Sequence, residues 1–471
     1  MLGFFPYGQA VIFFDVKKGE AFPYWGDKMS TILIKDAVIV TMNAGREIVH
    51  GNLLVEDNLI KAIGQVECAA DKVVEARGQV VIPGLVQTHI HLCQSLFRGQ
   101  ADDLELLDWL KLRIWPLEGA HDSESLYYSA LLGTGELFRS GTTAIIDMET
   151  VNHTEAAFQA IVESGIKALS GKCMMDWGAG VPASLLENTE ESLRKSVDLL
   201  EKWHGQGNGR LQYAFAPRFA ISCSEELLLQ VRDLARQYKV KVHTHASENR
   251  GEIAVVQEER KMRNVVYFDH LGMANEDLIL AHCIWLDDEE MEIIRRTGVK
   301  VAHCPSSNLK LASGIAKIPE MLSKGIQVSI GADGAPCNNN LDQFTELRTA
   351  ALIQKPVHGP TAMPAWQTFE LATLGGAKAM GLERETGSLE AGKKADLAMV
   401  DLRKLHCTPM EGSDIYAQLV YQARGSDVTL TMVDGRVVYE NGALTTIDEA
   451  EVINKCNQAI KRVYQRAGIT R

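Results

Sequence analysis

Two textures of apolar residues alternate along the chain and predict where its domains lie. From Thr31 to Ile82, short β-branched runs such as Val38–Val40 are separated by Asn, Gly and Asp, which is typical of strands and turns. The same texture returns over residues 396–401 and 430–438. We therefore expect the two flanks of the chain to form one β-rich domain.

Between the flanks, apolar strand patterns alternate with longer amphipathic patterns. The predicted strands cover residues 143–147, 213–216, 240–245, 278–282, 299–303 and 328–333. The predicted helices cover residues 190–203, 225–237 and 287–297. Strands that alternate with helices favour a parallel sheet, and many such units in succession favour a (β/α)8 barrel. A further amphipathic pattern, over residues 448–465, predicts a helix near the C-terminus.

These patterns predict an α/β fold with a bipartite domain around a barrel. We expect a (β/α)8 TIM barrel over residues 84–385, set into a small β-sandwich domain formed by residues 29–83 and 386–445. Residues 446–471 are expected to add a C-terminal helix. Residues 1–28 have neither a basic segment nor a clear cleavage site, so we interpret them as an extension of doubtful origin, with a fresh start at Met29. The alternative is a native extra strand on the first sheet.

Composition and charge narrow the classes of partner. The chain has 471 residues, 46% hydrophobic and 23% charged, which is ordinary globular composition. Its net charge of -13 argues against nucleic acid or anionic lipid as a partner, because both require a basic face. No apolar run approaches the ~20 residues that a transmembrane helix needs. We therefore expect neither a nucleic acid nor a membrane partner.

Cysteine usage indicates the compartment. The nine cysteines are scattered, their number is odd, and no CxxC pair occurs. A disulfide framework is not expected from such a pattern, and a reducing, cytoplasmic location fits it better. We interpret most of these cysteines as small buried apolar residues.

Polar residues recur where predicted strands end, and the carboxyl ends of barrel strands build active sites. His89 and His91 follow one strand, and residues two apart in a strand point the same way. His282 ends a later strand, and Asp333 ends another. His243 and His245 share a strand, so either could complete this group of candidate metal ligands. Histidines and an aspartate that converge at one barrel end suit a divalent ion, most simply Zn²⁺.

Two further residues near these strand ends have predicted roles. Glu248 follows His245 by three residues, in the next loop, where it could shuttle protons. His303 also ends a strand, and we interpret it as a supporting or structural residue. The sequence has no GxSxG nucleophile elbow and no Walker or Rossmann glycine pattern, so serine-hydrolase and nucleotide-fold interpretations fail.

These segments resemble the amidohydrolase superfamily, and within it the aminohydrolases that act on purines and related heterocycles. The resemblance extends from Met29 to about Gly442. Its most specific parts are residues 83–94, 243–248, 280–283, 303–311, 331–340 and 387–397.

The resemblance implies one metal per subunit. Its ligands would be His89, His91, His245 and Asp333, with Zn²⁺ expected and Fe²⁺ or Mn²⁺ as alternatives. The strand that would carry the bridging lysine of binuclear members, residues 213–217, has no lysine, which implies a mononuclear site.

The resemblance also implies catalytic roles. Asp333 would accept a proton from the attacking water, and His282 would orient that water and stabilise the developing charge. Glu248 would protonate the ring nitrogen beside the amino-bearing carbon. Proton return to the amino group would then release ammonia, so that oxygen replaces the amino group.

Two sets of residues point to different purines. Residues 98–104, 306–311 and 333–340 look like deaminases of 5'-methylthioadenosine, S-adenosylhomocysteine or 5'-deoxyadenosine. Residues 216–224 look instead like guanine deaminase, in which an arginine at the position of Arg218 reads the base. Because arginine only donates hydrogen bonds, Arg218 would prefer an acceptor edge of the purine.

Four other residues complete the predicted substrate pocket. Gln94 is compatible with recognition of a purine edge, and Trp109 could form a wall against an aromatic base. Glu248 and His282 would contact the reacting part of the ring.

Two alternatives to a purine deaminase stay open. One is a hydrolase of substituted s-triazines or pterins, acting as an amino- or chlorohydrolase. The other is a non-catalytic assembly protein that keeps the barrel. For the enzyme, we expect a small heterocyclic substrate and, by analogy, a homo-oligomer, either a dimer or a tetramer.

Overall fold

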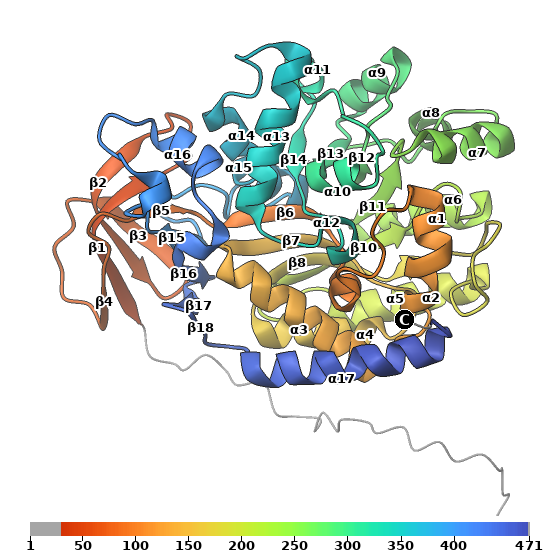
Figure 1. The fold of residues 1–471 in the computed structure, drawn as a ribbon, viewed down its shortest axis with the longest axis horizontal. Coiled ribbons are helices and arrows are strands. Elements are labelled where there is room, and N and C mark those ends of the chain that lie inside the picture. Colours follow the sequence, from red (N-terminus) through yellow and green to blue (C-terminus); the bar gives the residue numbers. More distant parts are fainter. Residues whose placement is uncertain (1–29, 470–471) are drawn as a thin grey trace, which may run out of the picture.

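The computed structural model describes residues 30–469, and its larger part is a parallel barrel surrounded by helices (Figure 1). The barrel strands follow the order β14-β13-β12-β11-β10-β8-β7-β6, with β9 beside β10. Their bounds are β6 Leu85–Ile90, β7 Thr142–Met148, β8 Lys167–Gly171, β9 Cys173–Met174, β10 Leu211–Pro217, β11 Lys241–Ala246, β12 Leu278–His282, β13 Lys300–His303 and β14 Val328–Ile330.

The first and last barrel strands, β6 and β14, approach each other and nearly close the barrel. The Thr88 hydroxyl lies 2.8 Å from the Ser329 hydroxyl, and the Asp333 N–H donates to the His89 carbonyl at 2.9 Å. These bonds place the carboxyl ends of β6 and β14 side by side. The predicted strand-end histidine and aspartate are therefore neighbours.

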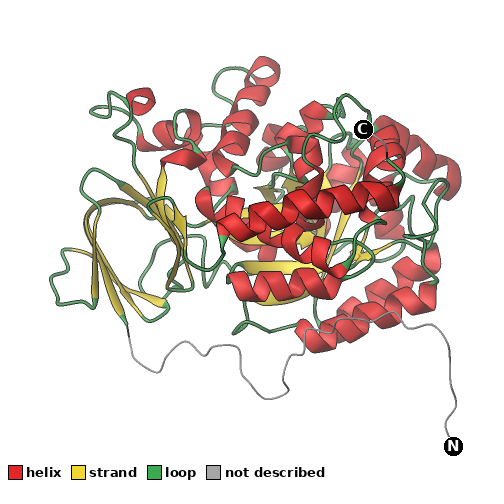
Figure 2. Ribbon diagram, turned by 60° about the horizontal axis from the view of Figure 1, so that its bottom comes forward, coloured by secondary structure: helices red, strands yellow, loops and turns green. Residues whose placement is uncertain are grey.

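Helices connect the barrel strands and cover their outer face (Figure 2). The longer ones are α3 Ser123–Arg139, α4 Thr154–Ser164, α5 Thr189–Trp203, α6 Glu225–Tyr238, α7 Arg250–Arg260, α9 Asp288–Thr297, α13 Gln343–His358 and α17 Glu449–Ala467. The shorter ones are α1 Leu106–Trp109, α2 Trp115–Glu118, α8 Asn264–His270, α10 Pro305–Lys310, α11 Ile318–Ser323, α12 Ala335–Asn338, α14 Ala365–Leu371, α15 Leu374–Met380 and α16 Ile415–Tyr421. Three short 3₁₀ helices, η1 Leu92–Phe97, η3 Leu405–Cys407 and η4 Gly425–Asp427, and one short π-helix, η2 Leu110–Ile114, are also present.

Helix α9 shows how the local sequence sets the bounds of these helices. The Asp287 carboxylate accepts the Glu290 N–H, and the Glu290 carboxylate accepts the Asp287 N–H, which forms a capping box. Gly298 ends the helix with φ 76°, a left-handed conformation that costs glycine little. Met291 and Ile294 lie on the buried face, so the amphipathic pattern of the sequence fixes which side packs on the barrel.

The second domain is a sheet of nine strands that come from both flanks of the chain. The order is β18-β17-β16-β15-β5-β1-β2-β3, and β4 pairs with β1. β15 lies antiparallel to β5, which joins the two flanks. The bounds are β1 Thr31–Val40, β2 Ile48–Glu56, β3 Leu59–Gly64, β4 Lys72–Glu75, β5 Val80–Pro83, β15 Leu397–Val400, β16 Val428–Val433, β17 Arg436–Glu440 and β18 Ala443–Leu444.

The predicted fold class is confirmed, with a barrel and an extra sheet domain made by both flanks. The predicted helices at 190–203, 225–237, 287–297 and 448–465 match α5, α6, α9 and α17 to within two residues at each end. The proposed extension at residues 1–28 lies outside the described residues. Across residues 30–469, no helix has both the length and the apolar character needed to cross a bilayer.

Candidate metal centre

Three histidines and one aspartate meet at the carboxyl end of the barrel. His89 belongs to β6, His91 directly follows that strand, His245 belongs to β11, and Asp333 lies just beyond β14. All four side chains are buried, and none of the four residues is more than 4% exposed. The structure thus brings together all four residues that the resemblance implied as ligands.

Backbone carbonyls orient two of these imidazoles. His91 Nδ1 lies 2.8 Å from the Met148 carbonyl oxygen, and His245 Nδ1 lies 2.7 Å from the Arg218 carbonyl oxygen. A carbonyl only accepts, so each Nδ1 carries the proton and each Nε2 presents a lone pair. Phe219 stacks on His245 with ring centroids 4.3 Å apart, which holds that ring further in place.

A fourth histidine orients His89. His89 Nδ1 lies 2.9 Å from His243 Nε2, and the two rings are nearly perpendicular. His89 Nε2 makes no hydrogen bond and points toward Asp333. Of the pair His243 and His245, which the strand pattern alone left open, His245 joins the ligand cluster and His243 supports His89.

The spacing of the ligand atoms fits a tetrahedral zinc site. Asp333 Oδ1 lies 3.3 Å from the Nε2 atoms of both His89 and His91, and His245 Nε2 lies 3.4 Å from His91 Nε2. Four ligands placed about 2.0–2.1 Å from a zinc ion at tetrahedral corners would be about 3.3–3.4 Å apart. These three separations therefore match those around a tetrahedral zinc ion.

The protonation states of these groups also suit a cation. Burial lowers the pKa of His89 to about 4 and lowers that of His245 well below its usual value. For Asp333, burial acts to raise the pKa, but the close approach of His89, His91 and His282 outweighs it and holds the pKa well below its usual value. Neutral imidazoles and an ionised carboxylate are the protonation states of metal ligands.

Asp333 and His282 both adopt strained backbone conformations where their strands end. Asp333 has φ 64° and His282 has φ 72°, in the left-handed region that costs a non-glycine residue about 1–3 kcal/mol. The Asp333 carboxylate is anchored as well, since it accepts from Ser307 Oγ at 2.6 Å and from the Gly334 N–H at 2.7 Å. Such strain is typical of side chains that are aimed at a functional site.

Glu248 and His282 lie beside the ligand cluster. His282 Nε2 is 3.5 Å from Glu248 Oε2 and 3.8 Å from Asp333 Oδ2, while His282 Nδ1 lies 2.8 Å from Asn308 Oδ1. Burial, together with the negative charge of Asp333, raises the pKa of Glu248 well above its usual value. Glu248 therefore keeps its proton to higher pH than an ordinary glutamate, which suits a general acid.

The structure gives Arg218 a partner that the sequence did not reveal. Its guanidinium donates to both oxygens of Glu118, at 2.5 Å and 3.1 Å, and Gln94 Nε2 donates to Glu118 Oε1 at 2.8 Å. All three side chains are buried. Glu118 ends the short helix α2 rather than a strand, so the strand-end pattern could not mark it.

This network reaches the metal centre through Gln94. A Cβ atom on Gly334 would lie only 1.9 Å from Gln94 Oε1, so only glycine fits beside Asp333 at this point. Gln94 Oε1 and Arg218 Nε have no hydrogen-bond partner among residues 30–469. An acceptor and a donor thus remain free for a ligand. Trp109 is buried in α1, and its predicted role as a wall of the pocket stays a prediction.

Two buried residues outside the predicted set support this end of the barrel. Asp147 accepts the Leu92 N–H at 2.9 Å and the Ser170 hydroxyl at 2.5 Å, which fixes the turn that follows His91. His121 is buried, and its Nε2 lies 2.8 Å from the Cys93 carbonyl oxygen. Asp147 does end the predicted strand over residues 143–147, whereas His121 ends no predicted strand.

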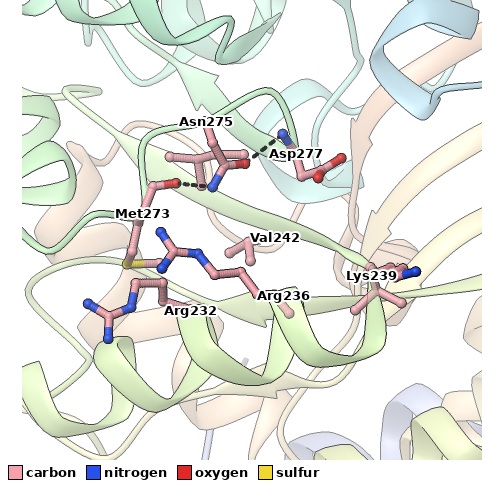
Figure 3. Close-up of a pocket in the computed structure, with 10 residues that line it drawn as sticks. Arg232, Arg236, Lys239, Val242, Met273, Asn275 and Asp277 are labelled. Carbon is pink, nitrogen blue, oxygen red and sulfur yellow. Dashed lines mark hydrogen bonds between the residues drawn. The ribbon is translucent and has the colours of Figure 1, made fainter.

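A different pocket lies where β11 and β12 begin, and therefore at the opposite end of the barrel. It has a volume of about 230 Å³ and is lined by Arg232, Arg236, Lys239, Met273, Asn275 and Asp277, among others (Figure 3). None of the predicted site residues lines it.

Comparisons with known proteins agree with this geometry. The family described as Amidohydrolase family matches residues 80–438. The chain is 41% identical to a 5'-deoxyadenosine deaminase of Methanobrevibacter smithii, over 93% of this chain and 99% of that protein. The similar solved structures include two deaminases. One is an adenosine deaminase from Xanthomonas campestris with bound zinc, at 31% identity and TM-score 0.86, covering 92% and 98% of the two chains. The other is E. coli guanine deaminase, at 30% identity and TM-score 0.78, covering 88% of this chain and 99% of that protein.

Proposed function

The chain belongs to the amidohydrolase family, and on that basis we propose that it is a zinc-dependent deaminase of a purine nucleoside. It would replace the amino group of the purine by oxygen and release ammonia. One observation carries the proposal: three buried imidazoles and one carboxylate meet at one point, where Asp333 Oδ1 lies 3.3 Å from His89 Nε2 and from His91 Nε2, and His245 Nε2 lies 3.4 Å from His91 Nε2, with a protonatable Glu248 beside them.

We propose one Zn²⁺ per subunit, held by His89, His91, His245 and Asp333. The donor set is typical of a zinc site. It consists of two imidazoles that are anchored to backbone carbonyls, the imidazole of His89, which His243 orients, and an ionised carboxylate. When bound, the ion would supply a nucleophilic water at neutral pH by lowering the pKa of that water toward ~7.

Each neighbouring residue then has a defined task. Asp333 accepts the proton of the attacking water, and its Oδ2, which Ser307 also holds, faces His282. His282 is anchored through Nδ1 to Asn308 and presents Nε2 to the water. Glu248 donates its proton to the ring nitrogen beside the amino-bearing carbon as the water attacks. A proton returned to the amino group makes it ammonia, which leaves.

We propose a nucleoside of the 5'-deoxyadenosine type as the preferred substrate. The support is the 41% identity to the 5'-deoxyadenosine deaminase across almost the full length of both chains. The pairing of Arg218 with Glu118 adds support, since it neutralises the guanidinium and leaves a carboxylate as a possible acceptor for ribose hydroxyls. Trp109 would contact the base.

Guanine is the second candidate substrate. It is favoured by Arg218, whose unpaired Nε would donate to an acceptor atom of guanine, and by Gln94, whose unpaired Oε1 would accept from a guanine N–H. The similar guanine deaminase is 30% identical. The two substrates are distinguishable because guanine lacks the ribose that Glu118 would bind.

The test is ammonia release by the zinc-loaded enzyme. The panel contains 5'-deoxyadenosine, 5'-methylthioadenosine, S-adenosylhomocysteine, adenosine, guanine, 8-oxoguanine, a pterin and an aminotriazine. We expect the highest kcat/KM with one of the adenosine-type nucleosides. Ammonia from guanine alone would select the second candidate. A protein that binds well under one divalent ion per chain, and releases no ammonia after zinc addition, would be the assembly protein instead.

We also propose that the protein works as a homo-oligomer, a dimer or a tetramer, in the cytoplasm. The cytoplasmic location rests on the nine cysteines, all of which are free thiols in the structure. Light scattering of the purified protein measures the oligomeric state directly.

A further inference from the structure

A second group of potential metal ligands lies next to the zinc ligands and includes a thiol. Ligand atoms of His89, His282 and Cys304 all lie within 4.8 Å of one another, and the three residues are buried. Cys304 follows β13 and precedes α10, so it comes from a strand that contributes nothing to the first ligand set. Only His89 belongs to both groups.

The hydrogen bonds of His89 and His282 show which of their nitrogen atoms are available to the second group of ligands. His89 Nδ1 is bonded to His243, and His282 Nδ1 to Asn308, which leaves the Nε2 atom of each ring. His89 Nε2 is buried and has no hydrogen-bond partner. The Cys304 thiol makes only a weak contact, 3.8 Å from the Ala302 carbonyl oxygen. Two imidazole nitrogens and a weakly bound sulfur are therefore free to share a cation.

We propose that His89, His282 and Cys304 form a second metal position, selective for thiophilic ions such as Cd²⁺ or Cu⁺. Thiolate and imidazole are the ligands that soft ions prefer, whereas the carboxylate of Asp333 suits harder ions. Because His89 has one free nitrogen, the two positions are alternatives for a single ion. An ion that prefers sulfur sits at the second position, away from His91 and His245.

The thiol proton leaves when the ion binds. The metal ligand is the thiolate, so an ion with a strong affinity for sulfur displaces that proton, which passes to solvent. Zinc at the first position thus leaves Cys304 protonated. The consequence for activity rests on the proposed function: an ion bound to His282 removes the side chain that orients the water, so a thiophilic ion inhibits the deaminase.

Cadmium binding tests the site without any use of activity. The metal-free protein is titrated with CdCl₂, and the ultraviolet charge-transfer absorption of cadmium thiolate is recorded together with the metal content. Cys304→Ser is compared with Cys337→Ser, a matched control, because Cys337 is also buried near Asp333 but bonds the Gly334 carbonyl at 3.0 Å and lies outside the second group.

We expect one Cd²⁺ per chain and a charge-transfer band in the wild type and in Cys337→Ser. In Cys304→Ser the band is lost and the affinity for Cd²⁺ falls at least about tenfold. Mutation of a residue that only orients a metal ligand already lowers metal affinity about tenfold or more, and loss of the ligand itself should lower it at least as much. Zinc affinity stays within about twofold in all three proteins, which also shows that each variant folds.

Two results would overturn the proposal. One is equal absorption and equal Cd²⁺ affinity in the wild type and in Cys304→Ser. The other, which needs no variant, is a ¹¹³Cd resonance of the wild-type protein at a chemical shift typical of nitrogen and oxygen ligands alone. Either outcome leaves the zinc site and the deaminase proposal intact, because neither measurement involves the substrate.

Discussion

The two ends of the barrel gather charged residues in opposite ways. At the carboxyl end, His89, His245 and Asp333 are buried, and their lone pairs converge on one point. At the amino end, the pocket of Figure 3 holds Arg236 and Lys239, which are exposed to solvent. Both ends are polar, yet only one has the geometry of a metal site.

The difference lies in the partners of the charged groups. Arg232 Nη1 donates to the Leu271 carbonyl at 2.8 Å and Arg236 Nη2 donates to the Gly272 carbonyl at 2.6 Å, so the arginines complete the carbonyl end of α8. In the candidate metal centre, burial lowers the pKa of His89 to about 4, and its Nε2 atom has no hydrogen-bond partner. Charge alone does not mark a site; burial with unused lone pairs does.

The largest effect is expected from Asp333→Asn. This change removes a proposed metal ligand, which is also the proposed acceptor of the water proton, so kcat should fall by about 10⁴-fold or more. Ammonia release measures the rate, and circular dichroism checks that the fold is kept. Full activity in this variant would show that the active site does not lie at the carboxyl end of the barrel.

Glu248→Gln should keep its zinc and lose about 10²–10⁴-fold in kcat, because it cannot donate a proton. The pKa of Glu248 is raised, so the protonated acid persists to higher pH than usual, and wild-type activity should fall as the pH rises through that pKa. The variant should lack this fall. Loss of zinc from Glu248→Gln would mean that Glu248 is a ligand.

Much of the metal centre was predictable because its residues follow buried strands. His89, His91, His282 and Asp333 each end an apolar run, and parallel strands deliver such residues to one edge. The barrel and the flanking sheet were predictable for a different reason, because the spacing of apolar residues changes where the chain enters and leaves the barrel.

The remaining residues could not be found in this way. Glu118 and Cys304 lie on or beside short helices, and their importance comes from neighbours far away in sequence, Arg218 and His282 respectively. His121 is placed by packing against the Cys93 carbonyl rather than by any periodic pattern. Tertiary contacts of this kind leave no spacing in the sequence.

Arg218→Ala should show an intermediate effect. Zinc content should stay the same, while KM should rise about 10–100-fold, the loss expected for a hydrogen bond from a charged group. The free energy of unfolding should also fall by about 3–5 kcal/mol, because Glu118 is left buried without a counter-charge.

A second variant separates the two effects of Arg218→Ala. Adding Glu118→Gln removes the buried charge, so urea unfolding should recover most of the lost stability while KM remains high. An unchanged KM in Arg218→Ala would place the guanidinium outside the pocket, and the substrate contacts would then have to come from other residues.

The smallest effect is expected at the opposite end. Arg236→Ala removes an exposed side chain that bonds one carbonyl, so the free energy of unfolding should change by less than about 0.5 kcal/mol. Zinc content and kcat/KM should be unchanged, as measured by metal analysis and ammonia release. A tenfold loss of kcat/KM would show that the two barrel ends communicate.

The pairing of β5 with β15 has a consequence for how the chain is made. These strands come from opposite flanks, and the residues between them form the barrel. During synthesis, the N-terminal flank emerges first and must wait for its partners until the barrel sequence has left the ribosome. Such long-range pairing slows folding and leaves β5 as an open strand edge meanwhile. Ribosome-bound chains truncated before Leu397 should therefore lack the completed sheet and be the species most prone to aggregate.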